Sequence, residues 1–120
     1  WIRWQCIRSL GEIRDRRALP TLVQALGDSD HSVAWMGAKG LVHFGRLSVG
    51  PVLRLLTNTP MTPWLVETAS YVLAHQRDPR LKPYLETVIQ GMRGPAFRVG
   101  TPHIAQKALS QLTADGLLET

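Results

Sequence analysis

Three side chains of metal-binding type recur at equivalent places along the chain. His43 follows Glu12, and His75 follows His43, at nearly the same interval. Two imidazoles and a carboxylate suit a transition metal when a fold brings them together. Polar residues beside turns show the same pattern without any ligand, so we predict no metal site here and no cofactor elsewhere.

The chain contains none of the common catalytic motifs that we sought. There is no Gly-rich phosphate loop with its Lys, no Gly-x-Ser-x-Gly elbow and no His-Glu-x-x-His. The single Cys6 falls on the apolar face of the first predicted helix, which indicates a buried thiol and not a nucleophile. We therefore assign no catalytic residue and favour a non-enzymatic function.

Basic side chains gather in three short polar segments. The chain has 14 Lys and Arg against 9 Asp and Glu, a formal net charge of +5. If the three segments are equivalent turns of a stacked fold, their arginines form a basic ridge that attracts nucleic acid or another polyanion. The residues that we assign to this ridge are Arg14, Arg17, Arg46, Arg77 and Arg80. Acidic residues interleave with them, which is also typical of a solvated edge.

Four tryptophans raise the same question, because aromatic rings stack on exposed bases. Their spacing favours packing. Trp4 and Trp35 are separated by the same interval as Glu12 and His43, and Trp1 and Trp64 are separated by about twice that interval. These places fall in the first turns of equivalent helices, where a large ring covers the preceding unit. Trp1 and Trp4 lack such a preceding unit, so we expect self-association through the N-terminal end.

An internal repeat explains these spacings. Pro20, Pro51 and Pro83 follow one another at a nearly constant interval, with apolar residues at matching places around them. Proline suits the first turn of a helix, where its missing N–H costs no hydrogen bond. A period of this length is typical of stacked helix pairs, each of which buries its apolar face against its neighbours.

The apolar spacing predicts seven helices. The first helices of the pairs are expected at 1–13, 32–44, 63–75 and 102–113. The second helices are expected at 18–26, 49–57 and 80–91. The predicted fold is all-α, a right-handed α-solenoid of about three and a half pairs within one domain over 1–120. Its repeats are placed at about 1–28, 29–58, 59–92 and, as a half repeat after a loosened segment, 101–120.

A family resemblance is strongest in residues 7–26. Leu-Gly-Glu-Ile at 10–13, Asp-Arg-Arg-Ala-Leu-Pro at 15–20 and Ala-Leu at 25–26 resemble a HEAT repeat of the phycobilisome-lyase-like kind. After about residue 64 the resemblance rests on the apolar skeleton and Pro83. It implies stacked pairs whose second helices line a concave face that holds a protein partner. The wider HEAT class also includes lyases of phycobiliprotein chromophores and DNA glycosylases.

We therefore predict a non-enzymatic scaffold that binds another protein on its concave face. The residues that we assign to that face are Gln24, Arg54 and Glu86. The first alternative is nucleic-acid or polyanion binding along the basic ridge. The second is lyase or glycosylase activity, which needs an acid in the concavity, and Glu86 is the one obvious candidate.

The remaining features concern the cellular compartment and the extent of the chain. No run of about 18 apolar residues predicts a membrane span, and no leader pattern opens the sequence. A lone cysteine is typical of the reducing cytoplasm, here of a bacterial protein. Because helical spacing begins at residue 1 without Met or a capping residue, we expect a piece of a longer array.

Overall fold

The computed structural model describes residues 2–13 and 15–118, and these form helices and turns without a strand. The all-α prediction is therefore confirmed for the described residues. Seven α-helices and two short 3₁₀ segments follow one another in this part of the chain. They are α1 (Ile2–Ile13), η1 (Arg16–Ala18), α2 (Leu19–Ala25), α3 (His31–Phe44), η2 (Gly45–Ser48), α4 (Val49–Asn58), α5 (Pro63–Ala74), α6 (Lys82–Arg93) and α7 (Phe97–Ala114).

Local capping explains why several helices begin where the sequence predicts. The Asp30 carboxylate accepts a hydrogen bond from the Ser32 backbone N–H at 2.9 Å, at the start of α3. The Thr62 hydroxyl accepts one from the Leu65 N–H at 3.1 Å, at the start of α5. Each bond satisfies a donor that has no partner within its own helix. The bounds of α1 to α6 agree closely with the prediction.

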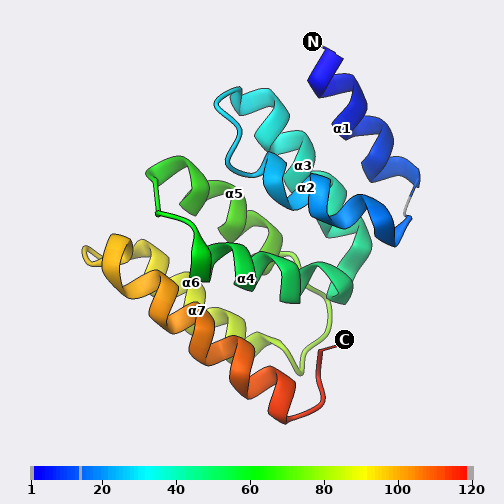
Figure 1. Cartoon of the computed structure of the whole chain (residues 1–120). Coiled ribbons are helices and arrows are strands. Elements are labelled where there is room, and N and C mark those ends of the chain that lie inside the picture. The colour runs from blue at the N-terminus through cyan, green and yellow to red at the C-terminus, as the bar shows by residue number, and fades with distance from the viewer. Residues whose placement is uncertain (1, 14, 119–120) are drawn as a thin grey trace.

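The helices lie in two layers (Figure 1). In the first layer α1 packs on α3 and α3 packs on α5, while in the second layer α2 packs on α4. The helices α2 and α4 run in the same direction, as successive second helices of stacked pairs do (Figure 1). Buried leucines, among them Leu22, Leu41 and Leu53, fill the space between the layers. The Thr68 hydroxyl of α5 also donates to the Leu26 carbonyl at 3.2 Å.

The last two helices exchange the layers predicted for them. The main neighbours of α7 are α4 and α6, and those of α6 are α5 and α7. Thus α7 extends the second layer, running opposite to α4, and α6 follows α5 at the end of the first layer (Figure 1). The prediction that 80–91 supplies a second helix and 102–113 a first helix is wrong.

The hairpin between α6 and α7 gives the physical reason. Residues 94–96 alone connect the two helices, and so short a connection makes them antiparallel neighbours. Because α7 begins at Phe97, Pro102 lies inside the helix and not in its first turn. The Tyr84 hydroxyl donates to the Asp115 carboxylate, which joins the start of α6 to the end of α7.

Two glycines let α1 and α3 cross in backbone contact. A Cβ atom built on Gly40 would lie 3.0 Å from the Cα atom of Gly11, closer than ordinary packing allows. Both residues are buried. Any larger side chain at either position would therefore push the two helices apart.

Candidate functional site

The first and third predicted turns share one local structure. In the first, the Arg17 backbone N–H donates to Asp15 Oδ1 at 2.9 Å, and its Nη2 donates to Oδ2 at 2.7 Å. In the third, the same bonds join Arg80 to Asp78 at 2.9 and 2.8 Å. An aspartate followed two positions later by an arginine thus closes each turn upon itself.

The second turn is tied to the third. Arg46 stands at the place that Asp15 and Asp78 occupy in the other turns, and its Nη1 lies 3.8 Å from Asp78 Oδ2. Asp78 therefore receives two guanidinium groups, from Arg46 and from Arg80. This contact places the second and third turns side by side.

The predicted basic ridge is, in the described residues, largely a row of ion pairs. Arg17, Arg46 and Arg80 each contact a carboxylate. Arg77 is exposed, and no partner for it occurs among the residues that the structure describes. Arg14 lies outside the described residues. Binding of a polyanion along the turns stays a prediction. Fewer unpaired cations support it than the sequence alone indicates.

These contacts lower the pKa values of both aspartates. The Arg80 side chain, followed by its backbone N–H, lowers the pKa of Asp78 to about 2, and Arg46 adds a smaller effect. Arg17 lowers the pKa of Asp15 to about 2 in the same way. A carboxylate with a lowered pKa stabilises the fold above its unfolded pKa, and this stabilisation is lost as the pH falls through the folded value.

The Asp78→Asn variant tests this linkage. Asparagine keeps an oxygen that accepts from the Arg80 N–H but loses the charge, so the variant should have a lower free energy of unfolding at pH 7. The difference from the wild type should shrink as the pH falls from about 4 to about 2. Urea unfolding followed by circular dichroism measures both values. Glu86→Gln, at an exposed carboxylate, is the control. A difference that persists unchanged at pH 2 would contradict the assignment.

The three residues assigned to the concave face do not share one layer. Gln24 and Arg54 are exposed on α2 and α4, which pack on each other. Glu86 is exposed on α6, at the end of the first layer, where it lines a hollow of about 330 Å³ between α5 and α6. Its assignment to the same face is therefore wrong, because α7 occupies the place beside α4.

The predicted set of Glu12, His43 and His75 lies along one groove without forming a metal site. Glu12 and His43 line one hollow, and His43 and His75 line the next. Glu12 accepts from Arg8 Nε at 3.4 Å, and His75 Nδ1 lies 2.7 Å from the Tyr71 carbonyl oxygen. Within residues 2–13 and 15–118, no group of three or more His, Cys, Asp or Glu side chains is arranged to hold a metal ion.

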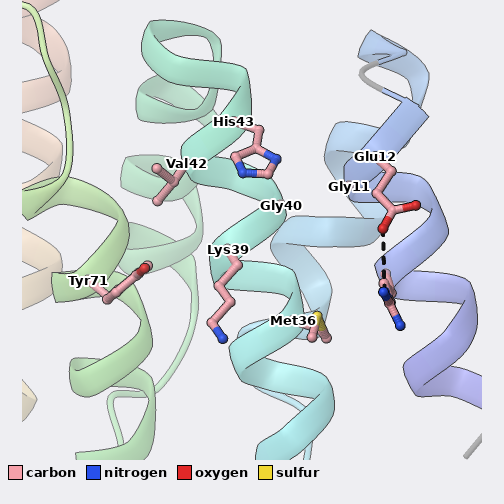
Figure 2. A pocket seen from close by; sticks show the side chains of 9 residues that line it. Gly11, Glu12, Met36, Lys39, Gly40, Val42, His43 and Tyr71 are labelled. Carbon is pink, nitrogen blue, oxygen red and sulfur yellow. Dashed lines mark hydrogen bonds and ion pairs between the residues drawn. The ribbon is translucent and has the colours of Figure 1, made fainter.

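We call these two joined hollows the first-layer groove. The first, of about 330 Å³, lies over α1, α3 and α5, and the second, of about 490 Å³, lies at the ends of α3 and α5. Val42 and His43 line both, so the two hollows adjoin. Figure 2 shows Lys39 on the side of α3 toward Tyr71, and Glu12 across from His43. The residue spacing indicated part of this groove, but not Lys39 or Tyr71.

Aromatic rings form a continuous chain along α3 and α5. His31 stacks on Trp64 with ring centres 3.8 Å apart, and Trp64 and Trp35 meet nearly at right angles with ring centres 5.7 Å apart. Trp35 then contacts Tyr71 at 5.3 Å, and Tyr71 contacts His75 at 4.1 Å. The predicted packing role is confirmed for Trp35 and Trp64. Nothing local in the sequence indicates the contact of His31, because Trp64 belongs to the next helix pair.

The N-terminal helix exposes residues expected in its interior. Cys6 is exposed, which corrects the prediction of a buried thiol. Ile2 and Ile13 are 75% and 64% exposed. The main neighbours of α1 are α2 and α3, so its remaining faces are open. Trp1 lies outside the described residues, and self-association through this end stays a prediction.

Two layers of short helices, stacked through equivalent turns, define a helical-repeat protein. A sequence model of the family described as HEAT repeats matches residues 1–74, and the chain therefore belongs to that family. The match ends with α5, immediately before the two helices that exchange layers. No curated protein and no solved structure shows significant similarity to the chain. Among the described helices, none combines the length and the apolar character that crossing a bilayer requires.

Proposed function

We propose that this HEAT-repeat chain is a scaffold that binds another protein on the exposed side of its second layer. The observation that carries the proposal is the side-by-side packing of α2, α4 and α7 into a surface three helices wide. HEAT repeats commonly serve as protein-interaction scaffolds, which supports a protein as the ligand. The resemblance of residues 7–26 supports the finer proposal of a phycobilisome-lyase-like repeat.

The composition of this surface indicates what a partner would meet. None of the residues in α2, α4 and α7 is Asp or Glu. Gln24 and Arg54 are exposed in the first two of these helices, and Gln106 and Ser110 are exposed in the third. These helices therefore offer amide and hydroxyl groups and the cations Arg54, Arg98 and Lys107, without a carboxylate in them to repel an acidic contact.

The alternatives have weaker support. Nucleic-acid binding along the turns would rest chiefly on Arg77, because Arg17, Arg46 and Arg80 already contact carboxylates. Lyase or glycosylase chemistry was tied to Glu86 in the concavity, and this residue lies in the other layer.

Site-specific photo-crosslinking tests the protein-binding proposal. A benzophenone amino acid replaces Gln24 or Arg54 in the second layer, and the exposed Ser9 of α1 provides the control position. In extract of the source cells, both second-layer positions should crosslink to the same protein, and Ser9 should not. Adducts with nucleic acid in place of protein, equal labelling from Ser9, or no adduct from either second-layer position would overturn the proposal.

A further inference from the structure

We propose that the first-layer groove is a second binding site, which takes an acidic segment of a protein partner. This site lies on the layer opposite to the surface proposed above and does not depend on it. Its charges, its two adjoining hollows and the hydrogen-bonded segments beside the second hollow each support the inference.

Among the described residues, the groove has unpaired positive charges but no unpaired negative charge. Both carboxylates that line it are already engaged, Glu12 by Arg8 and Asp78 by Arg46 and Arg80. Two cations that line it, Lys39 and Arg77, have no partner among the described residues. An added carboxylate group would therefore meet a positive charge in either hollow, whereas an added cation would have no unengaged acid to contact.

The shape of the groove favours a chain segment over a small anion. Lys39 lines the first hollow and Arg77 the second, and the two hollows adjoin at Val42 and His43. Met36 and Tyr71 add apolar surface to the first hollow, against which the aliphatic part of a partner side chain can pack. A ligand that reaches both cations must therefore carry its carboxylates at separate points along an extended segment.

A buried hydrogen-bond network holds the second hollow in shape. Gln76 Nε2 donates to Ser48 Oγ and to the Val72 carbonyl, each at 3.2 Å. The Ser48 hydroxyl donates to the Gly45 carbonyl at 2.7 Å. Ser48 is fully buried and Gln76 nearly so. Because these bonds already fix the segments that carry Arg46 and Arg77, little ordering is required when a ligand binds.

The same charges disfavour nucleic acid in this groove. A phosphate backbone carries a negative charge at every nucleotide along its length. Glu12 and Asp78 lie within the groove, where such a uniform chain of charge would pass close to them. A protein segment can instead place neutral residues beside these two carboxylates and acidic residues beside Lys39 and Arg77.

Fluorescence anisotropy with a labelled peptide of alternating Glu and Ala tests the proposal. The wild type should bind this peptide, and the Lys39→Glu, Arg77→Glu double variant should bind at least about tenfold more weakly. The matched control is the Lys82→Glu, Arg93→Glu double variant, which makes the same change of charge at exposed residues of α6 that line neither hollow of the groove nor the second-layer surface. Its affinity should stay within about twofold of the wild type, since distant exposed charges are screened.

Amide chemical shifts of the wild-type protein provide a second measurement that does not depend on how the variants fold. The Glu peptide should shift the amides of Gly45, Arg46 and Gln76, and a peptide of alternating Gln and Ala should not. The proposal is overturned if the α6 variant loses as much affinity as the groove variant. Binding of oligothymidylate as tight as that of the Glu peptide, or shifts confined to the second layer, would overturn it as well.

Discussion

Replacing Leu53 by Ala should lower the free energy of unfolding by about 3 kcal/mol. Leu53 is fully buried in α4, the helix that packs on α2, α5 and α7 and so joins the two ends of the molecule. Removing its three outer carbon atoms loses transfer free energy and leaves a cavity that surrounding helices can fill only in part. Urea denaturation followed by far-ultraviolet circular dichroism measures the loss.

Ile13→Ala is the matched control for this prediction. Ile13 is also a large aliphatic residue, but it is 64% exposed at the end of α1. Its truncation should change the free energy of unfolding by about 0.5 kcal/mol or less. Equal losses in the two variants would show that α4 is not the centre of the packing described above.

Adding one methyl group at Gly40 should lower the free energy of unfolding by about 2 kcal/mol. The new Cβ atom would lie 3.0 Å from the Gly11 Cα atom and 3.3 Å from a methyl carbon of Leu22. A side chain can rotate away from such a contact, but the backbone of α1 cannot, so α1 must move away from α3. Thermal and urea unfolding of Gly40→Ala measure the cost.

Gly100→Ala should instead raise the free energy of unfolding. Gly100 lies inside α7, and nothing lies within 4 Å of the place where its Cβ atom would be. Alanine loses less backbone entropy than glycine when it folds into a helix. The free energy of unfolding of this variant should therefore rise by about 0.5 kcal/mol. If Gly40→Ala also gained stability, the close crossing of α1 and α3 would be contradicted.

The glycine pair also concerns the first-layer groove. Gly11 and Gly40 both line its first hollow, so the close crossing that they permit helps to shape the site. Moving α1 away from α3 should therefore change the first hollow more than the second, which is lined by residues of α3, η2 and the segment after α5. The two proposed binding surfaces lie on different layers, which allows both to be occupied at once.

Helix positions were readable from the sequence because their causes are local. Apolar spacing, the capping residues Asp30 and Thr62, and the recurring prolines act within a few residues of each helix start. The period of the repeat also predicted that equivalent turns stack, as the contact between Arg46 and Asp78 shows. The family followed from the same residues, since the match covers the part of the chain where the period is regular.

Apolar spacing shows which side of a helix is buried, but not which neighbour covers it. The tertiary structure alone decided that α7 lies beside α4, because the short hairpin after α6 turns the chain back against the second layer. The tertiary structure also decided that Cys6 is exposed, because its side of α1 lacks a covering helix. It decided as well that His31 stacks on Trp64. The sequence thus determined seven helices and their turns. Tertiary contacts decided which residues share a surface, because that depends on distances between segments far apart in the chain.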